Sequence, residues 1–390
     1  MTCRPFEINR KAFLLAGMAL TFSLPYRISI LFPQTWHGYV ALTLFLAALT
    51  LFYLFAPPPK SSPHALDKRI AYPLSLILIG LAGILRLHWM RAYPIDAQYG
   101  DMLPLIDQAG RHFLSGHFPY TEYHVPWPLP LTFFPMLWIS YLPTLLLNLD
   151  LRWTGLVCTL LLIPLLLHRR PAALLPVLLF AILPVFTFFT VNGHTQPYWL
   201  YLCAFGYALT RRNPLASAVF LGLTLASRQT ALILVPFAAL AWYRSHGLRP
   251  AGIALCISGT VTAALCLPFF LINPHAFLLE PLHHYRELAE AYRQGTGDPA
   301  RLLETLGFAN LFSVLSLTHL LGPARILILL LGIGGCARVA RTPADHIAWM
   351  AATGMLFTFF TPIPWLYAYY PWWLLGILAL PVTSEPDPLP

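Results

Sequence analysis

The side chains best suited to acid–base chemistry gather in one polar stretch, residues 91–128, of a chain that is otherwise largely apolar. Its ionisable members are Asp96, Asp101, Asp107, Glu122, Arg111, His112, His117 and His124. A carboxylate beside an attacking hydroxyl group can accept its proton, which raises the rate of a transfer reaction by about 10² to 10⁴. We expect Asp101 to be this general base, with Asp96 as the alternative.

A second group of polar side chains could bind a phosphate. A phosphate that leaves with negative charge needs guanidinium, imidazole or backbone N–H groups directed at it. Arg228 is the leading candidate because it lies beside Gln229 between two apolar segments, and ionisable residues in such positions commonly mark function in membrane proteins. The next candidates are His194, which shares a turn with Gln196, and Arg286.

The same residues allow plainer roles. Asp101 directly precedes a helix expected over residues 102–114, MLPLIDQAGRHFL. Asp is a favoured N-cap residue, so its carboxylate could do no more than cap that helix. Arg228 could simply extend towards the membrane surface. His112, His117 and His124 lack the spacing that would bring them together as metal ligands. We therefore expect no metal site in the protein, and a divalent cation is the one cofactor left open.

The composition identifies the elements that must position these groups. Of 390 residues, 58% are hydrophobic and only 10% are charged, whereas soluble domains carry about a quarter charged residues. At about 20 residues per crossing, the apolar runs predict an all-α, polytopic transmembrane bundle of about 10–13 spans. The net charge of +9 comes from short Lys and Arg clusters between these runs. The clusters therefore indicate membrane topology, and we expect no nucleic-acid binding.

Clusters of Lys and Arg favour the cytoplasmic side of a membrane when loops are short. They predict two N-terminal spans and a cytoplasmic linker over residues 1–70, a larger membrane domain that holds the site over residues 71–380, and a short cytoplasmic tail over residues 381–390. Two polar loops of the larger domain then face the outside of the membrane, the first at 91–128 and the second at 273–305.

Two segments are expected to lie in the membrane interface. Residues 129–143 form a short apolar run that is broken by prolines. Residues 280–294 repeat apolar side chains at the spacing of an amphipathic helix that lies on a membrane, and this helix could cover the site as a flap. With this topology the candidate residues meet at the outer face, where they are joined by Tyr120, His124, Trp365 and Tyr367.

Several motifs of the chain resemble those of the GT-C superfamily of membrane glycosyltransferases. The run from Asp101 to Gly116, Pro119 and Tyr120, followed by YHVPWPLPL, resembles the first-loop signature of that superfamily. The turn GHTQ at 193–196, the helix LASAVFLGLTLASRQTALILVPF and the stretch PIPWLYAYY follow in the family's order. The chain is most similar to the mannosyltransferase-like group that uses polyprenyl-phosphate sugars, glycosyltransferase family 87.

This resemblance implies an enzyme that transfers a hexose, such as mannose, from a polyprenyl-phosphate donor to a lipid or glycan acceptor. It implies inversion at the sugar. The short loops fit a bacterial inner membrane, and the topology predicted above places the site on its outward face. The chain departs from the family where Arg228 replaces the commoner Lys and where Tyr367 stands near an expected His. Two other functions stay open, a polymerase or ligase of lipid-linked glycans and a flippase or transporter of them.

Overall fold

The computed structural model describes residues 10–24, 36–56, 68–294, 306–363 and 365–382. In chain order the α-helices are α1 (Arg10–Phe22), α3 (Trp36–Phe55), α4 (Lys68–Ala92), α5 (Met102–Leu114), α6 (Pro135–Ile139), α7 (Leu142–Leu146), α8 (Arg152–Leu167), α9 (Leu174–Ile182), α10 (Pro184–Asn192), α11 (Gln196–Thr210), α12 (Pro214–Leu225), α13 (Val235–His246), α14 (Leu248–Ile272), α15 (Glu280–Gln294), α17 (Ala309–Val314), α18 (Leu321–Val339), α19 (Pro343–Phe359) and α20 (Tyr370–Ile377). Short 3₁₀ or π turns are η1 (Pro171–Ala173), η2 (Gln229–Leu234), η3 (His275–Leu279), η4 (Thr318–Leu320) and η5 (Leu366–Ala368). The strands β1 (Glu122–His124) and β2 (Pro128–Pro130) pair in antiparallel orientation.

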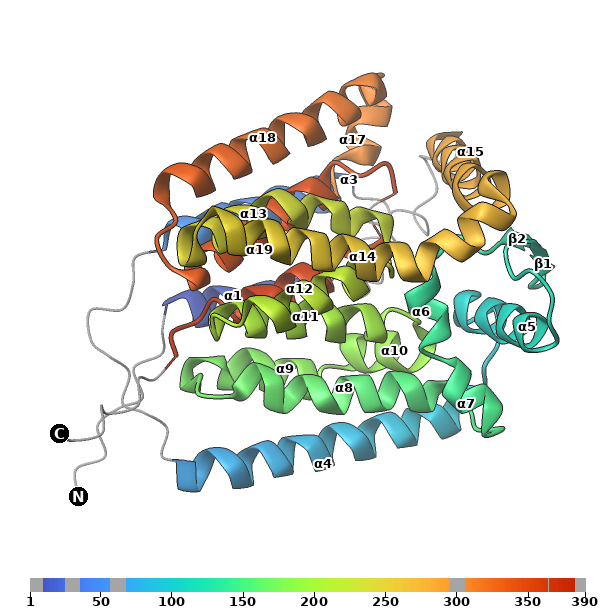
Figure 1. The fold of residues 1–390 in the computed structure, drawn as a ribbon, viewed down its shortest axis with the longest axis horizontal. Helices are drawn as coiled ribbons and strands as arrows, with labels where there is room; N and C mark the ends of the chain where they lie inside the picture. The colour runs from blue at the N-terminus through green and yellow to red at the C-terminus, as the bar shows by residue number, and fades with distance from the viewer. Residues whose placement is uncertain (1–9, 25–35, 57–67, 295–305, 364, 383–390) are drawn as a thin grey trace.

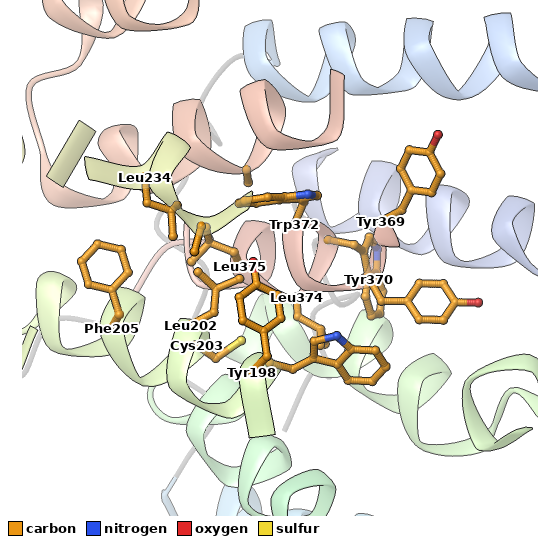
Figure 2. Packing of buried hydrophobic residues seen from close by; sticks show 14 of the residues in the cluster. Tyr198, Leu202, Cys203, Phe205, Leu234, Tyr369, Tyr370, Trp372, Leu374 and Leu375 are labelled. Atoms are coloured by element: carbon orange, nitrogen blue, oxygen red, sulfur yellow. The ribbon is translucent and has the colours of Figure 1, made fainter. Parts of the chain in front are cut away.

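The described part of the chain is nearly all helical, which confirms the predicted all-α class. Most of the longer helices run roughly parallel to one another (Figure 1). Their packing is dominated by aromatic and aliphatic side chains, and Figure 2 shows Trp372 and Leu375 of α20 beside Tyr198 and Leu202 of α11. All four of these side chains are buried, so α11 and α20 form part of the core of the bundle.

Four helices are long and apolar enough to cross a membrane: Gly38–Phe55, Tyr72–Ala92, Leu248–Ile272 and Thr318–Val339. A fifth crossing results if α9, extended to Pro171, and α10 form one broken span, with a bend of 62° between its halves. The structure thus supports a multi-pass membrane protein, but within the described residues it gives four or five such spans where 10–13 were predicted. The cause is that many apolar runs end early, so that α8, α11, α12, α13 and α19 have only 12 to 17 residues.

The described parts of the two polar loops, residues 91–128 and 273–294, lie at the same end of the bundle (Figure 1), and residues 295–305 of the second loop are outside the described part of the chain. α4 leads into α5, β1 and β2 at one end, and α14 leads into α15 at that end too (Figure 1). The α13–α14 and α18–α19 connections lie at the opposite end (Figure 1). The structure therefore agrees with the predicted grouping of the loops, while the assignment of their end to the outside stays a prediction.

Residues 129–143 do not form a crossing. They contain the end of β2, the whole of α6 and the start of α7, and each of these two helices has only five residues. Pro135 and Pro143 lie in the first turns of α6 and α7, where the missing N–H costs no hydrogen bond. The prolines thus divide the apolar run into short helices beside α5, and their place in the membrane interface stays a prediction.

A buried arginine on α4 holds the break between α9 and α10. Arg86 is 1% exposed and donates hydrogen bonds to Thr190 Oγ1 (2.8 Å) and to the carbonyls of Ala181 (3.0 Å) and Phe180 (3.2 Å). The last carbonyls of a helix have no hydrogen-bond donors within the helix. At the end of α9 the Arg86 guanidinium supplies these donors. The bend is therefore fixed, and with it the direction of α10.

Candidate functional site

A cavity of about 660 Å³ lies between α15, the start of α18 and the segment that joins α19 to α20. Three guanidinium groups line it, from Arg228, Arg286 and Arg325. None of the described residues that line it carries a carboxylate. The cavity therefore has a strong excess of positive charge, which suits an anionic ligand.

Arg228 lies where α12 has ended and η2 has not yet begun, with an extended backbone (φ −150°, ψ 138°). Its guanidinium forms hydrogen bonds with the hydroxyls of Tyr285 and Tyr367. It also lies 6.0 Å from the centres of the Phe133 and Tyr367 rings. The partly buried charge of Arg228 is thus held by phenols and aromatic faces, which are partners that an anion could replace.

The wall around Arg228 is aromatic. Trp365 and Tyr367 stack with 5.9 Å between ring centres and 13° between planes. Tyr285, from α15, lies 6.5 Å from Trp365 and donates to Thr132 Oγ1 over 3.4 Å. The amphipathic helix predicted over residues 280–294 is therefore α15, and its Tyr285 side chain reaches Arg228.

Asp101 occupies the N-cap position of α5, but its side chain makes no cap hydrogen bond there. Burial is the main reason that the pKa of the Tyr367 hydroxyl is raised, and the nearby Asp101 charge raises it further. A Cβ on Gly100 would lie 2.8 Å from the Asn192 carbonyl oxygen, so the loop before Asp101 packs directly on the end of α10. The carboxylate thus lies within electrostatic reach of Tyr367, which lines the cavity, although Asp101 itself does not line it.

Asp96 has a different role in the same loop. Its side chain is exposed, and Oδ1 accepts a hydrogen bond from the Gln98 backbone N–H at 2.9 Å. The backbone N–H groups of Tyr99 and Gly100 bond to the Asp96 carbonyl. This Asx-type turn shapes the loop that leads to Asp101.

His194 lies in the turn after α10 and is 3% exposed. Its ring centre is 4.4 Å from that of Phe133 and 6.0 Å from that of Tyr367. Burial, and then the positive charge of Arg228, hold the pKa of His194 well below its ordinary value. His194 is therefore neutral at pH 7, and its Nε2 is buried without a hydrogen-bond partner.

Two of the predicted substrate-binding residues are engaged inside the protein. The Gln196 amide donates to the Phe189 carbonyl (2.8 Å) and accepts from the Tyr141 hydroxyl (3.2 Å). The Tyr120 hydroxyl donates to the Phe133 carbonyl (3.0 Å) and accepts from Trp138 Nε1 (3.2 Å). In this arrangement Gln196 and Tyr120 hold the backbone around the cavity and do not line it.

The remaining candidates divide into two groups. Gln229 lines the cavity and donates to the Thr132 carbonyl (3.3 Å), and Arg286 lines it from α15 with an exposed side chain. His124 is exposed on β1 and does not line the cavity. The structure therefore gathers Arg228, Gln229, Arg286, Trp365 and Tyr367 around one cavity, with His194 and Asp101 near Tyr367.

The structure brings His112 and His117 into contact, which their sequence spacing did not predict. Their rings lie 4.8 Å apart, because Gly116 adopts a positive φ of +86° and turns the chain back onto the end of α5. His112 Nδ1 pairs with the Tyr123 hydroxyl at 3.1 Å. Among the described residues no three His, Cys, Asp or Glu side chains gather as metal ligands.

Sequence reasoning missed Arg325. It lies near the start of α18, within the apolar span Thr318–Val339, and lines the cavity. The signal was present in the sequence, since a charged residue inside an apolar span is by default a candidate for function.

The chain matches no protein-family model, no curated protein and no solved structure. Its function therefore has to be inferred from the chemistry of the cavity and of the residues around it.

Proposed function

We propose that the protein is a membrane glycosyltransferase of the GT-C type, which transfers a hexose from a polyprenyl-phosphate donor to a lipid or glycan acceptor. The observation that carries this proposal is the cavity with three guanidinium groups and no carboxylate among its described lining residues, beside the Asp101 carboxylate. Its volume of about 660 Å³ falls in the range of small-molecule sites, about 300–1,000 Å³.

The cationic side chains suit the phosphate of the donor. A guanidinium can form two parallel hydrogen bonds with a phosphate and keeps its charge at any physiological pH. The Arg228 guanidinium lies 6.0 Å from the ring centre of Tyr367, and its charge acts on His194. In the proposed reaction Arg228 stabilises the charge that develops on the departing phosphate.

The aromatic wall suits the sugar and the prenyl chain. The stacked rings of Trp365 and Tyr367 offer an apolar face with polar edges, which is a combination that large aromatic side chains bring to binding sites. The neutral imidazole of His194 lies at the edge of Tyr367. A sugar bound against this wall would lie between Arg228 and the Asp101 loop.

The proposed chemistry is a single displacement. The acceptor hydroxyl oxygen forms a bond to the anomeric carbon while the bond from that carbon to the phosphate oxygen breaks, and the bonding electrons leave on the polyprenyl phosphate. Asp101 takes the proton of the acceptor hydroxyl. No nucleotide has to be bound, because the donor already carries its phosphate leaving group.

The test is sugar transfer from a polyprenyl-phosphate hexose to a lipid acceptor by the purified protein in liposomes. Arg228→Gln should lower kcat by about 10² or more, as the loss of one charge-stabilising donor does in other enzymes. Arg249→Gln, on an exposed residue at the opposite end of the bundle (Figure 1), is the matched control and should transfer at the normal rate. Equal rates for Arg228→Gln and the native protein would refute the proposed role.

The same liposomes address the other functions. A protein that moves the lipid-linked sugar between leaflets, but joins it to no acceptor, would be a flippase. One broken helix pair, α9 and α10, is found in the described residues, whereas transporters typically pair such helices in two related halves. The transferase proposal is therefore the better supported of the two.

A further inference from the structure

Arg325 faces inward from a helix that otherwise faces the membrane. Its neighbours on α18 are between 56% and 64% exposed apolar side chains, namely Ile326, Leu327, Leu330 and Leu331. The Arg325 guanidinium instead lines the cavity and lies 5.5 Å from the ring centre of Phe357 on α19. The Arg325 side chain of α18 therefore points into the cavity, whereas these four apolar side chains lie on the outer surface of the bundle.

One N–H group of the Arg325 guanidinium has no hydrogen-bond acceptor. Its Nε is buried and has no partner, and the described residues that line the cavity include no carboxylate. A buried donor without a partner and a charge without a counter-ion are both costly. Among the described residues Arg325 therefore has no counter-ion, and an anion in the cavity would supply both the charge and the hydrogen-bond acceptor.

The cavity walls near Arg325 indicate what kind of anion fits. On the α18 side they include Leu321 and Gly322, and on the α15 side Leu282 and Ala289. Leu282 is exposed as well as lining the cavity. Each of the two helices thus lines the cavity with apolar side chains and with one guanidinium group, Arg286 on α15 and Arg325 on α18, a combination that suits a lipid with an anionic head.

We propose that Arg325 binds the phosphate of a lipid that enters the cavity sideways from the membrane between α15 and α18. The lipid chain lies along the exposed leucines of α18. Naming this lipid as the polyprenyl phosphate of the donor rests on the proposed function, but the phosphate site itself does not. Arg325 is then the first group to hold the lipid, and Arg228 the group beside the reacting bond.

The first experiment uses the native protein in detergent and three probes: a polyprenyl phosphate, the matching polyprenol and inorganic phosphate. Binding is followed by tryptophan fluorescence, because Trp365 and Trp372 line the cavity. The lipid phosphate should bind at least about tenfold more tightly than either of the others, since it alone has both the charge and the chain. Equal affinity for the polyprenol overturns the phosphate site, and equal affinity for inorganic phosphate overturns its assignment to a lipid.

The second experiment changes the residue. Arg325→Gln should weaken binding of the polyprenyl phosphate by about tenfold or more and leave binding of the polyprenol unchanged. Arg338→Gln, on an exposed residue at the other end of α18, is the matched control. Native affinity in a folded Arg325→Gln protein overturns the proposal, and if this variant does not fold, the three probes on the native protein decide.

These assays contain neither a sugar nor an acceptor, so they separate this inference from the proposed function. A protein that binds the lipid phosphate through Arg325 but transfers no sugar contradicts the transferase and supports the phosphate site. A protein that transfers sugar with an unchanged KM for the donor after Arg325→Gln overturns the phosphate site alone.

Discussion

Replacing Asp101 with Asn separates catalysis from helix capping. The structure gives Asp101 no side-chain cap bond to α5, and Asn would in any case cap a helix about as well as Asp. Asn has the same shape but cannot accept a proton at neutral pH. If Asp101 is the general base, Asp101→Asn should therefore lower kcat for sugar transfer by about 10² to 10⁴.

Other properties of the Asp101→Asn protein should stay close to native. No described cap bond is lost, so the melting temperature should change little. Binding of the polyprenyl phosphate should also persist, because Asp101 does not line the cavity. The pKa of Tyr367 should fall somewhat, since the Asp101 charge helps to raise it, but should remain above its ordinary value because burial is the main cause.

Asp96→Asn is the matched control in the same loop. The bond from the Gln98 N–H to Oδ1 needs only an oxygen at that position, which Asn keeps. This variant should transfer sugar at nearly the native rate. If Asp96→Asn loses activity and Asp101→Asn does not, the base is Asp96, and if neither loses activity, the first loop supplies no base.

Three further predictions follow from the arrangement of the helices. Replacing Leu282 and Leu288 of α15 with Ser should raise the apparent KM for the lipid donor with little change in kcat, and an unchanged KM would mean that α15 only packs on the bundle. In a background without other cysteines, a Cys at Glu122 should react with an impermeant maleimide on intact cells, whereas a Cys at Leu248 should react only after permeabilisation, and the opposite pattern would move the site to the cytoplasmic face. Arg86→Met should lower the melting temperature markedly, because each buried carbonyl left without a donor costs about 1–3 kcal/mol, and native melting would show that the break between α9 and α10 does not depend on Arg86.

Composition and periodicity were enough to predict the helical class and two particular helices. The run 102–114 and the amphipathic segment 280–294 appear with those bounds as α5 and α15. Both are amphipathic segments of the polar loops, so their own side-chain pattern determines which face is buried. The longer apolar segments lack such a pattern, and their ends depend on prolines and on neighbouring helices, which is why the described residues hold fewer helices of spanning length than the 10–13 crossings predicted.

Close contacts between distant residues were harder to predict. The contact between the tilted rings of His112 and His117 depends on the positive φ of Gly116, which turns the chain back onto the end of α5. The role of Gln196 depends on Phe189, across the turn that follows α10, and on Tyr141, which directly precedes α7. The sequence therefore shows that a polar side chain in an apolar chain needs a hydrogen-bond partner. Which residue becomes that partner is decided only by the fold.

The cavity itself combines segments that are far apart in the sequence, and its main polar groups come from four of them. Arg228 precedes η2, Tyr285 lies on α15, Arg325 lies on α18 and Tyr367 lies between α19 and α20. The Tyr285 hydroxyl of α15 and the Arg228 guanidinium interact, so α15 is coupled to the cation that the proposed donor phosphate would bind. If the donor binds as proposed, its phosphate competes with Tyr285 for Arg228, and donor binding is then linked to the position of α15.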